Sequence, residues 1–386
     1  MSRPRRCLLL FCLAALAVPA GASAHHRWHG PIAHIAGAGV PNDPGKGDGT
    51  GWQGVQWNFA GLWGVNAQQA WNNVATVGRP GGKGTVVAVL DTGVAYANRG
   101  KFKRSPDFGA HQFVRGYDFV SHDAYPDDPN GHGTHVAGTI AEATNNGFGL
   151  TGLAFGAKIM PVRVLDANGE GDPGTIARGV RWAADHGANV INLSLEFGRE
   201  VTAASIPTLI KAIRYAHAKH VVIVGASGNE AAGTVAYPAR ASYVISVGAT
   251  TEHGCLADYS NQGQGLDVVA PGGGNDTDIT GEPQCKPDDP PGNDISQFSY
   301  VNFHRKFGIN REEGTSMAAP HVSAIAALVI ASGVIGKNPT PNAVANRIEA
   351  TARDLGTAGY DQDYGWGLVD AAAATAPGGP TVPPVA

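Results

Sequence analysis

The chain has 386 residues, of which 43% are hydrophobic, so it can bury the core of one large α/β domain or of two small ones. Charged residues make up only 16% and the formal net charge is −4, a balance that gives no support for nucleic-acid binding. The 54 glycines, about twice the usual frequency, indicate many tight turns and suit an extracellular enzyme.

The first 24 residues have the form of a secretory signal peptide. Three arginines precede an apolar run at residues 8–18 that is too short for a normally flanked membrane span. Residues 22–24 fit the small-x-small cleavage rule, so we expect a mature chain that starts at His25. An uncleaved anchor is the alternative, but we expect a secreted protein, extracellular or periplasmic, with no stable membrane anchor.

Residues 25–56 are rich in His, Gly, Pro and Asp, and this composition predicts a flexible N-terminal extension. Residues 49–54 match the dinucleotide pattern G-x-G-x-x-G, but they follow no predicted strand and open no predicted helix, so we reject the match.

Two of the four cysteines leave with the signal peptide. The other two, Cys255 and Cys285, most simply form one disulfide in an exported chain.

Continuous apolar runs predict strands that are buried on both faces, as in a parallel sheet. These runs lie at residues 85–90, 159–164, 190–195, 221–224 and 243–247. Helices are predicted at residues 63–74, 132–143, 175–186 and 203–219. The alternation predicts a doubly wound α/β domain, with a mostly parallel central sheet and helices on both faces.

The C-terminal third begins with residues 272–312, which contain Gly, Pro and Asp clusters and predict a long loop-like insertion. A helix from Ser316 and a second helix at residues 342–352 follow. Residues 374–386 consist mainly of Ala, Pro and Gly and predict a disordered tail. No second core-forming unit is evident, so we expect a single domain.

Ser316 follows a Gly-Thr turn and opens an apolar helical run. A helix N-terminus presents free N–H groups and the positive end of the helix dipole, which favour developing negative charge at a nucleophile. An ordinary N-cap is the alternative for a serine at this place.

A base and its partners can be found in three further stretches. His132 opens a small-residue helix, and His135 lies three residues later; the pair could bind a metal, but no Glu of an H-E-x-x-H motif accompanies it. Asp91 ends an apolar strand, where a carboxylate needs a partner, although it could instead accept turn N–H groups. Asn229 follows a strand and a glycine, and its amide can donate a hydrogen bond, although Gly-Asn alone signals only a turn.

Taken together, Asp-Thr-Gly at 91–93, His-Gly-Thr-His at 132–135, Ser-Gly-Asn at 227–229 and Gly-Thr-Ser-Met-Ala at 314–318 resemble the subtilisin-like serine proteases, of secreted bacterial type. The resemblance extends over about residues 57–373. It implies a single peptidase domain that acts on polypeptide substrates, and we expect a monomer.

The resemblance also implies the role of each residue. Ser316 would attack the peptide carbonyl, His132 would carry the proton, and Asp91 would orient the imidazole. Asn229 and the backbone N–H of Ser316 would bind the oxyanion. The substrate would lie as an extended strand between two segments, Gly169, Glu170 and Gly171 on one side and Ser194, Leu195 and Glu196 on the other. Ala226, Ser227 and Gly228 would form the other wall of the primary specificity pocket.

Structural Ca²⁺ is a further implication. The loop at residues 145–150 resembles the family's calcium loop, with Asp107 as its acidic partner, and the implied ligand residues are Asp107, Asn146, Phe148 and Leu150. A plain Asn-Gly turn is the alternative.

Three features depart from the family's pattern. Glu196 stands where the family usually has glycine, and it could crowd a subsite or attract basic residues. Only about thirty residues separate the signal from the peptidase region, too few and of the wrong composition for the usual pro-domain. The insertion at 272–312 could cover part of the site.

A competing α/β-hydrolase would need G-x-S-x-G and a different residue order. An inactive, subtilase-like binding or adhesion module would be expected to lack a triad residue, and none is missing.

Overall fold

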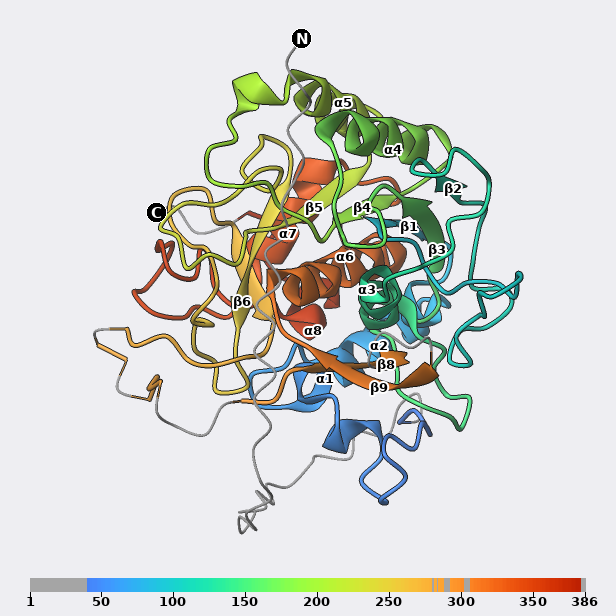
Figure 1. The fold of residues 1–386 in the computed structure, drawn as a ribbon. Coiled ribbons are helices and arrows are strands. Elements are labelled where there is room, and N and C mark those ends of the chain that lie inside the picture. The colour runs from blue at the N-terminus through green and yellow to red at the C-terminus, as the bar shows by residue number, and fades with distance from the viewer. Residues whose placement is uncertain (1–39, 280, 283, 288–291, 302–305, 383–386) are drawn as a thin grey trace.

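The computed structural model describes residues 40–279, 281–282, 284–287, 292–301 and 306–382. The predicted signal peptide therefore lies outside the described residues. A seven-stranded, all-parallel sheet forms the centre of the molecule, in the order β2-β3-β1-β4-β5-β6-β7 (Figure 1). Its strands are β1 Val86–Asp91, β2 Tyr117–Asp118, β3 Lys158–Arg163, β4 Val190–Leu193, β5 Val222–Ala226, β6 Ile245–Thr250 and β7 Val268–Pro271. The prediction of a doubly wound α/β fold is confirmed.

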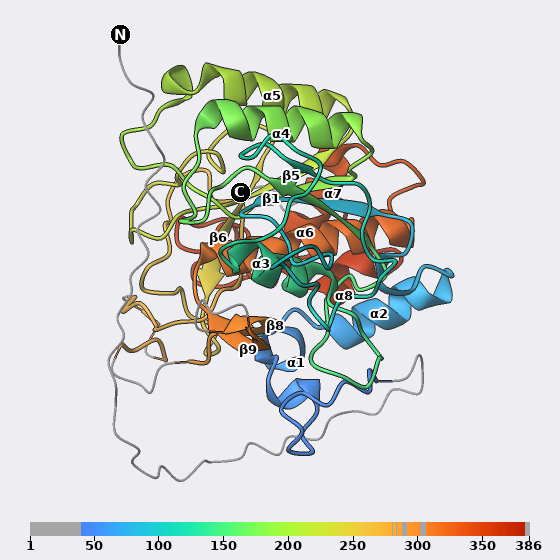
Figure 2. The same cartoon turned by 45° about the vertical axis from the view of Figure 1, so that its right-hand side comes forward.

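Helices cover both faces of this sheet. On one face α4 (Pro173–Asp185) and α5 (Pro207–Ala218) pack side by side (Figure 2). On the other face lie α3 (His132–Ala141), α6 (Thr315–Ser332) and α7 (Pro341–Ala350). Alternate residues of β1 serve the two cores, with Val87 and Val89 on the α6 side and Ala88 and Leu90 on the α4 side. The apolar run of this strand therefore reflects burial on both faces, as a parallel sheet requires.

Helix α6 is the central helix of the fold. It is the one helix among the described residues that is long and apolar enough to cross a membrane, but nearly all of it is buried inside the protein. Its residues contact β4, β5, β6, β7 and α3, so its first turn is fixed against the carboxyl ends of the strands. This rigidity matters because Ser316 lies in that first turn.

The N-terminal part of the described chain differs from the prediction of a flexible extension. Residues 40–56 pack onto the domain, where Trp52 is fully buried in the short helix η1 (Trp52–Gly54). The Nε2 of Gln56 donates to the carbonyl of Thr151 at 2.8 Å. The composition predicts a flexible segment because glycines dominate it, but the buried Trp52 and the hydrogen-bonded Gln56 fix the segment to the domain. Helices α1 (Trp57–Ala60) and α2 (Ala67–Thr76) follow, in place of the single predicted helix at residues 63–74.

The predicted insertion is only partly a loop. Strands β8 (Ile295–Val301) and β9 (Lys306–Glu312) form an antiparallel hairpin that packs on α3. The Sγ atoms of Cys255 and Cys285 are bonded, as predicted, and they join the earlier part of the insertion to the segment after β6.

The predicted disordered tail is also wrong for residues 374–382. Helix α8 (Ala371–Thr375) lies in its first part, and the buried guanidinium of Arg347 donates to the carbonyls of Ala374 at 2.9 Å and Pro380 at 2.6 Å. A buried guanidinium requires such acceptors, and these carbonyls supply them.

Candidate active site

The carboxyl ends of the parallel strands, the segments that follow them and the first turns of α3 and α6 meet at one edge of the sheet, and the predicted catalytic residues all lie there. Asp91 is the last residue of β1 and His132 the first of α3. Asn229 follows β5, and Ser316 is the second residue of α6. Sites of open α/β sheets form at this edge because the connections diverge there.

Asp91 and His132 form a buried pair. The Nδ1 of His132 lies 2.8 Å from Oδ1 of Asp91, and that oxygen also accepts the backbone N–H of Thr92 at 2.7 Å. Gly133 permits this approach, because a Cβ there would come within 3.0 Å of the Asp91 carboxylate. Burial opposes the charged imidazolium, but the charge of Asp91 and its hydrogen bond outweigh burial, so the pKa of His132 is raised above its usual value. Asp91 can therefore orient the imidazole ring of His132 and stabilise its protonated form.

A second aspartate, Asp128, supports the loop that carries His132, and the sequence argument missed it. It is fully buried, and its Oδ1 accepts the N–H groups of Asn130 and Gly131. Its Oδ2 accepts from the hydroxyl of Thr134. The signal that could have found it is an Asp two residues before an Asn-Gly pair, which is typical of side-chain-capped turns.

Ser316 lies against the segment that follows β4. Its Oγ donates to the carbonyl of Ser194 at 3.4 Å, and the Oγ of Ser194 donates to the carbonyl of Ser316 at 2.7 Å. Gly314 begins this turn with φ 144°, a backbone conformation that favours glycine. The nucleophile candidate is therefore fixed to a predicted substrate-binding strand as well as to a helix N-terminus.

The side-chain amide of Asn229 is fixed beside the same turn. Its Oδ1 accepts the backbone N–H of Thr315 at 2.8 Å and the Thr315 hydroxyl at 3.0 Å. Because a backbone N–H can only donate, this contact assigns the amide orientation and identifies Nδ2 as the end available for donation.

Two of the three predicted substrate segments contact this turn, through Ser194 and Gly228. Leu195, Ala226 and Ser227 are buried in the walls, and the Oγ of Ser227 donates to the carbonyl of Asn261. Residues 169–171 belong to the turn after β3, where the N–H of Asp166 donates to the Glu170 carbonyl and the N–H of Glu170 donates to the side-chain Oδ1 of Asp166. The backbone N–H and Nδ2 of Asn229 donate to the carboxyl group of Glu196, which links the segment after β5 to the segment after β4.

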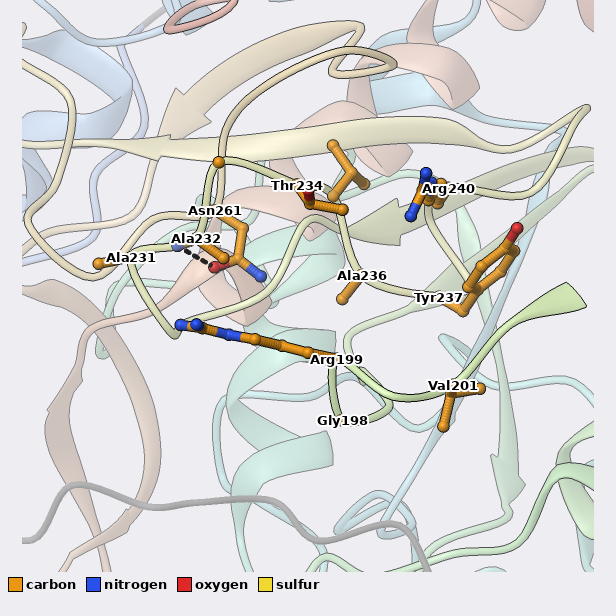
Figure 3. A pocket seen from close by; sticks show the side chains of 12 residues that line it. Gly198, Arg199, Val201, Ala231, Ala232, Thr234, Ala236, Tyr237, Arg240 and Asn261 are labelled. Carbon is orange, nitrogen blue, oxygen red and sulfur yellow. Dashed lines mark hydrogen bonds between the residues drawn. The ribbon is translucent and has the colours of Figure 1, made fainter. Parts of the chain in front are cut away.

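A cavity of about 500 Å³ adjoins these walls (Figure 3). It opens between residues 198–201, which follow Glu196 in the chain, and residues 231–237, which follow Asn229. Arg199 and Arg240 lie at its rim, and Asn261 closes one side, where its Oδ1 accepts the N–H of Ala232. The cavity can extend the region that receives substrate side chains.

His135 and His321 each contact a neutral partner in the protein interior. His135 Nε2 lies 3.1 Å from the carbonyl of Ile295 in the hairpin, and burial lowers its pKa. His321 lies 2.8 Å from the amide of Asn58, and burial lowers its pKa to about 3. Over the described ranges, no group of three or more His, Cys, Asp or Glu side chains is arranged to hold a metal. The interpretation of His135 as a packed neighbour is supported.

The predicted calcium loop surrounds Asp107. Its Oδ2 accepts the N–H of Leu150 at 2.8 Å, and its Oδ1 accepts from Nδ2 of Asn146 at 2.9 Å. The Oδ1 of Asn146 accepts the N–H of Phe148. Burial raises the pKa of Asp107 to about 7.

Two further carboxyl groups, which the sequence argument missed, lie close to Asp107. Glu142 is fully buried, its Oε2 has no hydrogen-bond partner among the described residues, and burial and Asp107 raise its pKa. Asp43 accepts the N–H groups of Asn145 and Asn146. An orphaned buried oxygen beside carboxyl groups that are costly to ionise fits an oxygen-seeking cation such as Ca²⁺.

The site brings the contacting pair Asp91 and His132 and a serine at a helix N-terminus to one edge of a parallel α/β sheet. The sequence model of the subtilase family, Peptidase_S8, matches residues 82–367. The chain belongs to the subtilase family of serine endopeptidases.

Relatives of known activity agree with this assignment. The chain is 38% identical over 325 residues to Subtilisin Savinase of Lederbergia lenta, a match that covers 84% of this chain and 99% of that protein. It is equally similar to M-protease of Shouchella clausii, with 84% of this chain and 70% of that protein covered. Among solved structures, a protease of Pseudoalteromonas arctica PAMC 21717 matches with a TM-score of 0.69 and 30% identity, over 87% of this chain and 99% of that chain.

Proposed function

We propose that this subtilase is a secreted endopeptidase that cleaves peptide bonds through the triad Asp91, His132 and Ser316 and an acyl-enzyme intermediate. The observation that carries the proposal is the buried 2.8 Å contact between Asp91 and His132, on the same sheet edge as a serine at a helix N-terminus. This arrangement supplies an oriented base and a nucleophile in one place.

In the proposed reaction, Ser316 Oγ attacks the peptide carbonyl while His132 Nε2 takes its proton. The long 3.4 Å contact from Ser316 Oγ to the Ser194 carbonyl is weak, so it leaves the hydroxyl free to turn toward the base. The negative charge on the former carbonyl oxygen is bound by Asn229 Nδ2 and the N–H of Ser316. His132 then protonates the leaving amine, and water hydrolyses the acyl-enzyme by the same route.

The substrate is proposed to lie between residues 169–171 and 194–196, with residues 226–228 as the other wall. The relatives' names describe alkaline proteases and subtilisins, which supports a polypeptide substrate. We further propose secretion after cleavage of residues 1–24, a monomeric enzyme, and a structural Ca²⁺ ion held by Asp107, Asn146, Phe148 and Leu150. When bound, the ion would neutralise the carboxyl groups near this loop.

The proposal is tested by casein hydrolysis and by labelling with a fluorophosphonate, which reacts with activated serines. The wild-type protein should hydrolyse casein and take up one label per chain, and Ser316→Ala should lose both. Hydrolysis that persists in Ser316→Ala would contradict the mechanism, and an inactive, unlabelled wild type would favour a binding module.

A further inference from the structure

Glu196 makes contacts that a substrate-wall residue does not need. Its Oε1 accepts a hydrogen bond from Nδ2 of Asn229 at 3.0 Å. The backbone N–H of Asn229 also donates to both carboxyl oxygens, at 3.2 and 3.1 Å. Only 7% of the Glu196 residue is exposed, so these bonds are shielded from water.

We propose that Glu196 is a positioning residue for Asn229, the oxyanion donor. The proposal rests on the proposed function, because it assumes that Asn229 binds the oxyanion. Thr315 holds the oxygen end of the amide and Glu196 holds the nitrogen end, so the amide plane is fixed at both ends. An amide nitrogen has two hydrogens, and the contact with Glu196 uses one, which leaves the other for the oxyanion.

The neighbouring backbone is shaped to receive this carboxyl group. Gly228 has φ 114°, and a Cβ at that position would come within 2.4 Å of Oε2 of Glu196. Any larger residue there would push the carboxyl group away from Asn229. The glycine before Asn229 therefore serves the contact with Glu196 as well as the turn itself.

The protonation state of Glu196 affects the hydrogen-bond donor Nδ2 of Asn229. Burial, and then the charge and hydrogen bond of Glu230, raise the pKa of Glu196 to about 8, although the Asn229 donors lower it. Glu230 is itself held by Asn261, whose Nδ2 donates to its Oε2 at 2.7 Å. The other charged groups on these packed segments are Arg199, whose guanidinium donates to the Glu230 carbonyl, and the exposed Glu200. Thr315 and Ser316, on the α6 side, carry no charge.

The sign of the pH effect follows from this arrangement. Below about pH 8 the carboxyl group is protonated, and it fixes the amide without placing a full negative charge beside the oxyanion. Above that pH a carboxylate repels the oxyanion and binds Nδ2 more tightly, and both effects weaken transition-state stabilisation. Ionisation of Glu196 should therefore lower kcat.

The test compares Glu196→Ala, which removes the acceptor, with Glu196→Gln, which keeps an acceptor but cannot ionise. Glu200→Gln, at an exposed position on the same segment, is the matched control. All rates are divided by the active-enzyme concentration from fluorophosphonate labelling, so misfolded protein does not count. At pH 7 we expect Glu196→Ala to lower kcat roughly tenfold with KM unchanged, a fraction of the loss seen when an oxyanion donor is removed. Glu196→Gln should recover most of that loss.

The pH dependence is read as the ratio of kcat of Glu196→Gln to that of the wild type, because titration of His132 cancels in this ratio. The ratio should be constant below pH 7 and rise about fivefold or more by pH 10, whereas the ratio for Glu200→Gln stays flat. An unchanged kcat in Glu196→Ala, a change in KM alone, or a flat Glu196→Gln ratio would overturn the proposal. A wild type that is neither labelled nor active would instead overturn the proposed function.

Discussion

Ser194 and Ser316 exchange hydrogen bonds between a substrate-wall segment and the nucleophile turn. The Oγ of Ser194 donates to the Ser316 carbonyl at 2.7 Å and accepts from Nδ2 of Asn192 at 2.9 Å. All three residues are buried, so the hydroxyl is part of a network that water cannot replace. The position of the first turn of α6 therefore depends on the strand that is proposed to bind substrate.

Replacing Ser194 by Ala should destabilise the protein and slow the reaction. The free energy of unfolding should fall by about 1–3 kcal/mol, because the Ser316 carbonyl and the Asn192 amide both lose a buried partner. Denaturant unfolding measures this change, and kcat should fall because the nucleophile turn is less firmly held. Ser242→Ala, at an exposed serine, is the control and should leave both quantities unchanged. Equal stability of the two variants would contradict the network.

Replacing Asn229 by Ala should lower kcat by roughly 10²–10³ with little change in KM, the loss observed when the oxyanion asparagine of a subtilisin is removed. The reason is that Nδ2 would stabilise charge only in the transition state. Steady-state kinetics on a chromogenic peptide measures the effect, and Asn338→Ala at an exposed site is the control. A rise in KM at constant kcat would show that Asn229 binds substrate and not the oxyanion.

The pH dependence of kcat/KM should show an acid limb with an apparent pKa above 6.5. His132 must be neutral to act as a base, and Asp91 raises its pKa in the folded protein. Activity therefore appears as the pH rises through that raised value. The stability that the pair adds has the opposite dependence: it is full below pH 6.5 and is lost as the pH rises through the folded pKa.

Asp91→Asn provides the matched test of this pair. It keeps the side-chain shape but removes the charge, so activity should fall by about 10⁴. If a pH titration placed the acid limb of the wild type below pH 6, the raised pKa of His132 would be contradicted.

Chelation should destabilise the protein if the loop at residues 145–150 binds Ca²⁺. At a free concentration a hundredfold above Kd, a bound ion adds about 2.7 kcal/mol, which corresponds to a fall in Tm of roughly 5–10 °C on chelation. Asp107→Asn should abolish the effect of the chelator, and Asp278→Asn, at an exposed site, should not. A Tm that does not respond to chelator and calcium would contradict the site.

The same loop predicts a pH dependence for the calcium-free protein. Burial raises the pKa of Asp107 to about 7, so its contribution to stability is present below about pH 4 and is lost as the pH rises through 7. Calcium favours the carboxylate and should reduce this loss. Thermal melts at pH 5 and pH 8, with and without calcium, measure the difference.

Five of the seven strands of the sheet and the helices that pack on it were predictable because their apolar runs and helical segments are long and locally consistent, whereas the short strands β2 and β7 were not predicted. The triad residues were predictable because each occupies a short motif at a strand end or a helix start. The hairpin β8–β9 was not predictable, because its strands carry buried polar residues such as Ser296 and Gln297, and Gln297 finds its partner on α3, in the hydroxyl of Thr139. The β-propensity of a segment contains no information on a contact between residues 158 positions apart in the sequence.

The errors at both ends of the domain have a related cause. Residues 40–56 and 374–382 have the composition of flexible chain, but a few anchors order them. Trp52 fills the core, and Arg347 binds the tail carbonyls. Similarly, the sequence marks Glu196 only as a departure at a usual glycine, because its contact with Asn229 depends on how the segments after β4 and β5 lie against each other.

The most direct test of the account is stoichiometric labelling of the secreted protein with a fluorophosphonate, followed by mass spectrometry of the labelled peptide. The account predicts one label per chain, on Ser316, with casein hydrolysis lost in proportion to labelling. Labelling that requires an intact Asp91 and His132 would confirm that the pair activates the serine. Full casein hydrolysis after complete labelling, or in Ser316→Ala, would contradict it.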